Sequence, residues 1–434
     1  MTDSEVTLEK DRPWYSGIGR YQWLVLVIAS AGWVFDVYES QIFNTTRQEL
    51  LGEMVQGLAG KEKTARVMFL GDLFLGIFLA GGMVGGLVFG ALGDRWGRRP
   101  TMILTILMYS IFSGLTYFAE NLWQVGILRF LVSMGIGGEW AIGAALVSEV
   151  FPARARSQAG AIFHASSTFG TWLAGTVAMI IGSNWRYGYL VGILPALLIL
   201  WIRASLQEPE AWQRQKKDDR HRSGGSLKEL LGDTQWRSRA IAGLLLAAVG
   251  LATYWGVTVA GQDLARNFAM REGRTEAEAQ ADSKFAYTVA QATGGGVGLL
   301  LFGPFCQWAG RRKAFALAHV MAIAIVPLTC LLPQSYNQLL IFLPLYGALT
   351  MWMHAGYAIY FPELFPTRLR ALGTSFCFNG GRIVAAVMLP ISGRIKGLPG
   401  LGLPLALCII SSTYLLGLII LRYLPETKNQ PLPE

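Results

Sequence analysis

The chain has 434 residues, of which 53% are hydrophobic and only 15% carry a charge. Soluble domains contain about 25% charged residues, so this composition excludes an ordinary soluble protein and predicts an integral membrane protein. The formal net charge of +9 does not indicate a nucleic-acid partner, because lysine and arginine collect in the cytoplasmic loops of membrane proteins.

Twelve apolar stretches have, or nearly have, the roughly 20 residues that a membrane-spanning helix needs. We therefore predict an all-α integral membrane protein. Its twelve transmembrane helices are expected near residues 21–43, 68–92, 101–119, 123–149, 158–181, 186–206, 238–260, 284–306, 314–332, 337–361, 371–393 and 401–424. The polar start, MTDSEVTLEKDRPWYSG, predicts no cleavable signal peptide. The cysteines fall in or beside apolar stretches without metal-type spacing, and we expect them to be free.

The distribution of lysine and arginine predicts the orientation. With both termini inside, the cytoplasmic segments hold more than twice as many of these residues as the outer loops, which indicates a multi-pass protein of the inner membrane. The predicted division is a cytoplasmic N-terminal segment (1–20), a six-helix bundle (21–206), a cytoplasmic linker (207–237), a second six-helix bundle (238–424) and a cytoplasmic tail (425–434). The outer loop 261–283 is expected to form a surface helix.

Two motifs occur in both halves in the same order. GALGDRWGRRP at 90–100 shares its first glycine and its Gly-Arg-Arg with GPFCQWAGRRK at 303–313, after the second span of each half. EVFPARAR at 149–156 is echoed by ELFPTRLR at 363–370, after the fourth span. These matches indicate a duplication of six spans. Repeats with an even number of spans keep the same orientation, and the substrate site is expected between them.

The charged residues Asp36, Glu39, Arg129 and Glu139 lie well inside the spans of the first half. Such residues are costly in a membrane and usually face the bundle interior or a water-filled cavity. The rise per residue places Asp36 and Arg129 at similar depths in the membrane, so an ion pair between them is expected. Protonation of Asp36 would then release Arg129 to bind the substrate, or the pair is permanent and structural. Glu39 is either a second site that binds a proton or a residue of a water-filled entrance to the cavity. Glu139, behind three glycines, carries a proton or makes a structural hydrogen bond.

Arg382, near the middle of the eleventh span, indicates an anionic substrate unless a carboxylate elsewhere in the bundle pairs with it. Asn379 precedes it by nearly one turn. Further candidates for the cavity wall are Gln291, Tyr254, Trp255, Tyr357 and Tyr360, although packing or an interfacial belt would explain any single aromatic residue. His164 and His354, in the fifth and tenth spans, are either functional or ordinary core residues.

The loop between the second and third spans predicts a gate. Its motif consists of Gly90, Asp94, Arg95, Gly97, Arg98 and Arg99. The carboxylate of Asp94 can face the positively polarised start of the eleventh helix, near residues 371–374. These contacts would close the cytoplasmic side in an outward-open state. If the arginines only set the topology, Asp94 and the glycine spacing stay unexplained.

The other predicted gate residues belong to the repeated motifs. Arg98 and Arg99 can meet Glu149, while Arg311 and Arg312 can meet Glu363. Arg154 and Arg368, which follow the two acidic residues in the EVFPARAR and ELFPTRLR motifs, complete the predicted gate.

The loop Gly90-x-x-x-Asp94-Arg95-x-Gly97-Arg98-Arg99 resembles the signature of the major facilitator superfamily, and the resemblance covers nearly all of 20–425. GGEWAIGAALVSEVFPARARSQAG, PELFPTRLRALGTSFCFNGGRI and Asp36-x-x-Glu39 are similar to the branch of proton symporters for sialate, aromatic acids and related metabolites. The ending PETK resembles sugar porters instead. The resemblance implies two pseudo-symmetric six-helix bundles. Glu39 stands where the branch often has Asp, and Gln307 replaces the Asp of the second-half loop, so gate contacts should differ between the halves.

We therefore predict a secondary active transporter that carries a small organic anion, most simply a carboxylate, together with protons by alternating access. Proton-coupled sugar or polyol uptake and proton-antiport efflux of a metabolite or drug are the alternatives. An enzyme would need a nucleophile and base or a set of metal ligands, which two histidines on separate spans do not supply. The expected partners are the substrate and the lipid bilayer, with no nucleic acid. We expect no metal and no cofactor beyond the coupling proton, and function as a monomer.

Overall fold

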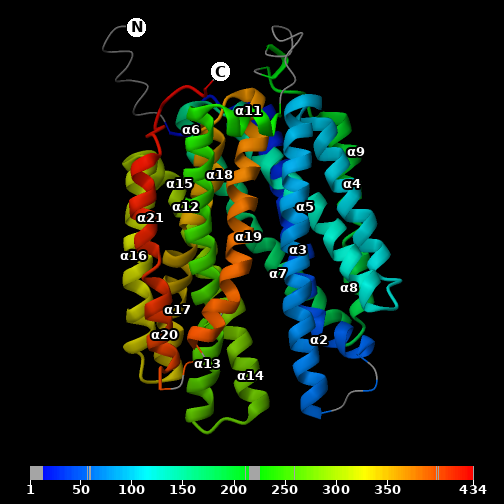
Figure 1. Ribbon diagram of the computed structural model, residues 1–434, viewed down its shortest axis with the longest axis vertical. Coiled ribbons are helices and arrows are strands. Elements are labelled where there is room, and N and C mark those ends of the chain that lie inside the picture. Colours follow the sequence, from blue (N-terminus) through cyan, green and yellow to red (C-terminus); the bar gives the residue numbers. More distant parts are fainter. Residues whose placement is uncertain are drawn as a thin grey trace.

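The computed structural model describes residues 13–55, 57, 60–210, 212–214, 225–258, 260–396, 398 and 400–433. Within these ranges the chain forms helices and connecting turns, and no strand (Figure 1). The helices up to residue 205 are α2 (Arg20–Met54), α3 (Gly60–Trp96), α4 (Arg98–Thr116), α5 (Leu122–Val150), α6 (Ala153–Ala165), α7 (Ser167–Ile181), α8 (Trp185–Val191) and α9 (Ala196–Ser205).

The remaining helices lie from residue 227 onward. They are α11 (Leu227–Gly232), α12 (Thr234–Thr258), α13 (Ala260–Arg271), α14 (Glu276–Phe285), the π-helical η1 (Ala286–Gln291), α15 (Ala292–Ala309), α16 (Arg311–Leu331), α17 (Tyr336–Met351), α18 (Met353–Glu363), η2 (Thr367–Leu369), α19 (Arg370–Lys396), α20 (Leu403–Ser411), α21 (Tyr414–Ile420) and η3 (Leu421–Tyr423).

Each predicted span corresponds to one helix or to consecutive helices. Nine segments of the described chain are long and apolar enough to cross a membrane by length and composition. The predicted spans outside these nine are α4, α6 with α7, and α19, each of which begins at arginines of a repeated motif. Several spans are interrupted, as at Ser166 between α6 and α7 and at Trp352 between α17 and α18. The predicted surface helix at 261–283 is instead two helices, α13 and α14, which pack on each other.

The helices form two groups, α2–α9 and α12–α21, that lie side by side (Figure 1). The start of α2 and the tail after η3 lie at the same end of the molecule, which we call the terminal end; α13 and α14 lie at the opposite, distal end (Figure 1). The contacts that join the two groups involve α19 with α3 and α5, and α6 with α15 and α18.

Close packing of α3 on α5 fixes the centre of the first group. A Cβ atom at Gly85 would lie 1.9 Å from the carbonyl oxygen of Met134, and one at Gly137 would lie 2.0 Å from that of Gly82. Only glycine permits such an approach of two backbones in a membrane bundle. As a result, every residue of α5 from Gly135 to Ser148 is buried, and so is Arg129.

Candidate functional site

A cavity of about 190 Å³ lies between the two groups of helices. The first group lines it with Trp33, Val37, Ser40, Gln41, Asn44, Leu75, Phe78, Leu79, Arg129, His164, Ser167, Thr168 and Thr171. The second group lines it with Leu251, Tyr254, Trp255, Tyr287, Gln291, Ala292, Gly347, Met351, His354, Phe378, Arg382 and Ala385. Along α2 these residues begin at Trp33, roughly 20 Å from the first residue of the helix at the terminal end. The last of them is Asn44, ten residues before the helix ends at Met54, so the cavity lies about midway along α2.

Five predicted substrate residues line this cavity: Arg129, Arg382, Gln291, Tyr254 and Trp255. Tyr357, also predicted for the substrate site, does not line this cavity: its ring is fully buried and stacks on Phe361, and its hydroxyl donates to the carbonyl of Leu246 at 3.5 Å. Tyr360 is likewise buried and donates to the carbonyl of Pro425.

Asn379 also lies behind the cavity wall and not in it. Its amide nitrogen donates to the carbonyl of Gly137 and to the hydroxyl of Ser375, both at 3.0 Å. The first of these bonds crosses between the two groups of helices. Its carbonyl oxygen accepts from Arg382 at 3.4 Å. Asn379 thus orients Arg382 from behind and does not contact the cavity itself.

Arg382 presents a half-buried guanidinium to the cavity. Besides Asn379, its neighbour is the ring of Phe378, whose centre lies 5.9 Å from the guanidinium carbon. No carboxylate of the described residues lies within 4.0 Å of it. A guanidinium with free N–H groups in an enclosed site is suited to bind a carboxylate with two parallel hydrogen bonds.

The expected ion pair between Asp36 and Arg129 is absent from this arrangement of the described residues. Arg129 donates to the backbone carbonyl of Glu39 at 3.0 Å and lies between two aromatic rings, 4.6 Å from the centre of Phe43 and 4.2 Å from that of Phe78. Arg129 thus contacts the backbone of Glu39, about one helical turn after Asp36, and both carboxylate oxygens of Asp36 have no hydrogen-bond partner among the described residues. The cation that acts on Asp36 electrostatically is Arg382.

The three acidic residues of the first group form a buried layer behind the cavity. Asp36, Glu39 and Glu139 are each at most 2% exposed and none lines the cavity. Glu139 presses against Gly32 of α2, where a Cβ atom would lie 1.7 Å from its Oε1, and it interacts with the side chain of Asp36. Glu39 accepts a 2.6 Å hydrogen bond from Ser113 of α4. None of the three forms an ion pair with another described residue.

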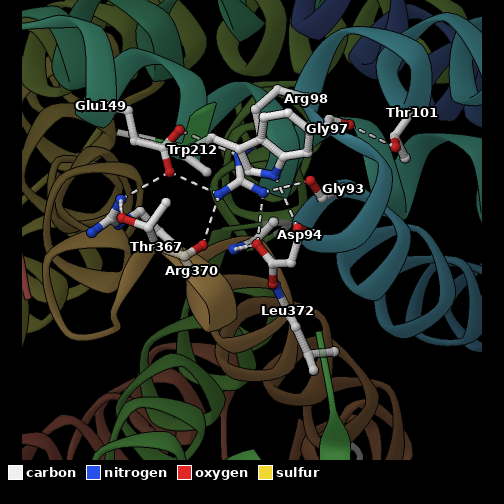
Figure 2. A network of polar contacts seen from close by, with 12 residues as sticks. Gly93, Asp94, Gly97, Arg98, Thr101, Glu149, Trp212, Thr367, Arg370 and Leu372 are labelled. Carbon is white, nitrogen blue, oxygen red and sulfur yellow. Dashed lines mark hydrogen bonds and ion pairs between the residues drawn. The ribbon is translucent and has the colours of Figure 1, made fainter. Parts of the chain in front are cut away.

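At the terminal end, the gate motif joins the two groups of helices (Figure 2). The carboxylate of Asp94 accepts from the backbone N–H groups of Ala371 and Leu372, each at 3.0 Å, where α19 begins. This is the predicted contact with the eleventh span. Gly90 allows the approach, since a Cβ atom there would lie 3.0 Å from the Cα of Leu372.

Arg98 is the centre of this network. Its guanidinium bonds to Asp94 at 2.6 Å and to Glu149 at 2.7 Å. It also donates to the carbonyl of Thr367 at 3.0 Å, in the other group of helices. Arg370 reaches Glu149 at 2.8 Å from the second group. Two guanidinium groups therefore share Glu149 in a buried site that spans both halves (Figure 2).

The second half repeats the pattern with different partners. Arg311 pairs with Glu363 at 2.8 Å, as predicted, and Arg156 approaches the same carboxylate at 3.8 Å from the first group. Arg312 does not meet Glu363; its Nε donates to the carbonyl of Leu421 at 3.1 Å. Gln307, in the place of the missing aspartate, accepts from the hydroxyl of Ser157 at 3.0 Å. The two loops thus differ, as the loss of the acid predicts.

Glycines begin the third span of each half in a conformation that other residues rarely adopt. Gly97 has φ 116° and Gly310 has φ 89°. The two following backbone N–H groups donate in the first half to Glu208, at 2.8 and 2.9 Å, and in the second half to Glu426, at 2.9 and 3.1 Å. Arg99 and Arg312 therefore contribute their backbone N–H groups to these two sites.

The remaining gate residues lie around this network. Arg154 donates to the carbonyl of Ser16, and Arg368 pairs with Glu229 at 2.7 Å. Arg95 is exposed at the end of α3. Three residues of the network were not among the predicted gate residues: Glu208, Glu426 and Trp212, whose indole N–H donates to the carbonyl of Asp94 at 2.9 Å. The sequence feature that could have indicated the two glutamates is the acidic turn after the last span of each half, LQEPEAW and LPETKN.

Apolar helices in two groups, a partly polar cavity between them and a polar network that closes one end define the class of a membrane transport protein. A family model described as "sugar (and other) transporter" matches residues 24–248 and 252–432. The chain belongs to this family of transporters, and it is therefore not an enzyme.

Curated relatives agree with this class. The chain is 26% identical over 427 residues to a probable 4-methylmuconolactone transporter of Cupriavidus pinatubonensis, covering 96% of this chain and 93% of the relative. It is 26% identical to the cis,cis-muconate transport protein of Acinetobacter baylyi, covering 82% and 86%. Among solved structures, the proton:xylose symporter XylE of the major facilitator superfamily matches with a TM-score of 0.76 at 16% identity, covering 95% and 98%. The fold is that of this superfamily.

Proposed function

We propose that the protein is a proton-coupled symporter that takes up a small organic carboxylate by alternating access. The observation that carries the proposal is Arg382, a cation that lines the cavity with no carboxylate partner among the described residues. A buried cation without a counterion is costly. A substrate carboxylate is the group that would neutralise it.

The names of several relatives support an acidic substrate. They include transporters of cis,cis-muconate, sialic acid and gentisate. The cavity wall is rich in aromatic rings, among them Trp33, Tyr254, Trp255 and Phe378. Such a wall suits a flat, partly apolar acid, with the rings providing contact area and Arg382 the charge.

Protons would be carried by the acidic layer behind the cavity. Asp36, Glu39 and Glu139 lie within a membrane-spanning bundle without an ion-pair partner, the setting typical of proton-carrying groups in transporters. Asp36 also interacts electrostatically with Arg382. A proton on Asp36 would remove this competing charge and leave Arg382 to the substrate.

In this scheme the terminal end faces the cytoplasm of a cell with the protein in its inner membrane. The networks around Arg98 and Arg311 join the two groups of helices on that side, so in this scheme the conformation is closed to the cytoplasm. Substrate and protons would enter from outside and leave after the networks separate. One chain contains both groups of helices, so a monomer suffices.

Pairs of ligands that differ only in charge test the anion assignment. We would measure the thermal stability of the purified protein with benzoate against benzamide, and with gluconate against sorbitol. The proposal predicts stabilisation by an acid and not by its neutral counterpart, because only the acid can neutralise Arg382. Stabilisation by sorbitol or benzamide equal to that by the acids would favour a neutral substrate and contradict the proposal.

A further inference from the structure

His164 occupies the wall of the cavity at the end of α6, immediately before the break at Ser166. Its Nδ1 accepts a hydrogen bond from the indole Nε1–H of Trp140 at 3.4 Å. An indole nitrogen can only donate, so Nδ1 must carry the lone pair. The neutral ring therefore has its proton on Nε2. Trp140 fixes the tautomer of His164.

The ring of His164 is also held in position by its neighbours. Its centre lies 5.5 Å from that of Trp33 and 6.1 Å from that of Trp140. Trp140 in turn stacks on Phe378, with ring centres 3.8 Å apart and an angle of 22° between the planes. These contacts come from α2, α5 and α19, so both groups of helices define where Nε2–H points.

Phe378 lies next to both His164 and Arg382. The centre of its ring is 6.4 Å from that of His164 and 5.9 Å from the guanidinium carbon of Arg382. The Nε2–H of His164 has no acceptor among the described residues, in contrast to its Nδ1. A molecule whose carboxylate is held by Arg382 and which lies along Phe378 would reach this donor.

We propose that His164 is a specificity-determining residue whose Nε2–H donates to a second acceptor on the substrate, such as a hydroxyl oxygen, a carbonyl oxygen or a ring nitrogen. The inference rests on the proposed function and narrows it. The preferred substrates are acids with a further hydrogen-bond acceptor at a distance from the carboxylate. An acid without that group would leave a donor in the cavity unpaired, which a site of this kind discriminates against.

The second histidine of the cavity wall does not offer the same group. His354 lies between Tyr254 and Tyr357, with ring centres 4.5 and 5.6 Å away, and its Nε2 is sealed from solvent without a hydrogen-bond partner. Its ring edge therefore does not present a donor to the cavity in this conformation. The proposal concerns His164 alone.

Two substitutions separate the two nitrogens of His164. In His164→Asn the amide oxygen can take the place of Nδ1 and accept from Trp140, but nothing replaces Nε2–H. In His164→Gln the longer side chain can place an amide N–H near the position of Nε2. The probes are benzoate, which has a carboxylate alone, and 3-hydroxybenzoate, 4-hydroxybenzoate and nicotinate, which add an acceptor at different ring positions. Affinities would be measured by isothermal titration calorimetry.

The wild type is expected to bind at least one acceptor probe about tenfold more tightly than benzoate, the usual worth of one additional hydrogen bond. In His164→Asn this preference should fall to about twofold or less, because the acceptor probes lose more affinity than benzoate does, and His164→Gln should keep part of the preference. The control is His319→Asn: His319 is buried in α16 against Tyr414 and outside the cavity wall, so the preference should persist. Melting temperatures of all variants show that each is folded.

A preference that survives in His164→Asn, or a loss of the same size for benzoate and the acceptor probes, would overturn the inference. A wild type that binds benzoate as tightly as all three acceptor probes would overturn it too, while leaving the carboxylate assignment intact. Failure of all four acids to bind the wild type would contradict the proposed function and this inference with it.

Discussion

Replacement of Asp94 by asparagine is expected to open the terminal end without removing the substrate site. The carboxylate accepts two backbone N–H groups of α19, each at 3.0 Å, and pairs with Arg98 at 2.6 Å. Asparagine keeps one acceptor oxygen, so one buried N–H of α19 loses its partner and Arg98 loses one of two carboxylates. An orphaned buried group costs about 1–3 kcal/mol.

That cost falls on the closed terminal end alone, because Asp94 joins α3 of one group to α19 of the other. A difference of about 1–3 kcal/mol shifts an equilibrium between two conformations about 5- to 150-fold. Asp94→Asn should therefore populate the conformation that is open at the terminal end, slow transport, and leave substrate affinity within a few-fold of wild type. The cavity residues are untouched by the substitution.

The assay is the distance between spin labels at cysteines replacing Trp96 and Trp308, both exposed at the terminal end, one in each group. Three of the four native cysteines are buried, so Cys408→Ala suffices to limit background labelling. The control is Asp233→Asn, because Asp233 accepts from the backbone N–H groups of Gln235 and Trp236 at the start of α12 and joins no second group. Asp94→Asn should lengthen the distance and Asp233→Asn should not. An unchanged distance in Asp94→Asn, or abolished binding in a folded protein, would refute the assignment of the gate.

Three further predictions concern the substrate, the proton and the topology. Arg382→Ala should weaken binding of an acid by about 1.5–3 kcal/mol in calorimetry, and Arg382→Lys should recover only part, because an ammonium group cannot form the paired bonds of a guanidinium; equal affinity in all three proteins would point to a neutral substrate. Asp36→Asn, as a permanent mimic of the protonated form, should keep substrate exchange between the two sides of a liposome but lose uphill uptake, and uphill uptake that persists would move the coupling role to Glu39 or Glu139. Cysteines near Thr427, for example at the exposed Asn429, and near Lys216, which lies outside the described residues, should react only with reagents on the cytoplasmic side. A cysteine at Arg274 should react only from outside, and the reverse pattern would invert the topology.

The sequence predicted the terminal network better than the cavity. The repeated motifs specified both the residues and their order along the chain, and the contacts of Asp94 with Ala371 and of Arg98 with Glu149 followed from them. These contacts form at the ends of helices, and the sequence motifs mark where each helix ends.

Side chains within the spans were harder to place. The rise per residue predicted similar depths for Asp36 and Arg129 and so an ion pair, which does not form, because the direction of a side chain also depends on how its helix is rotated and packed. Asn379 and Tyr357 were therefore expected in the cavity and lie behind it. The break at Ser166, which has no clear mark in the sequence, ends α6 at the position where His164 meets Trp140.

The central claim is that one transport cycle carries an organic acid and protons in the same direction. Liposomes containing the purified protein and an internal pH dye would receive 4-hydroxybenzoate outside, without an imposed pH gradient. The account predicts acidification of the interior that depends on the protein and is lost in Asp36→Asn. Uptake of the acid with no protein-dependent change of internal pH would contradict it.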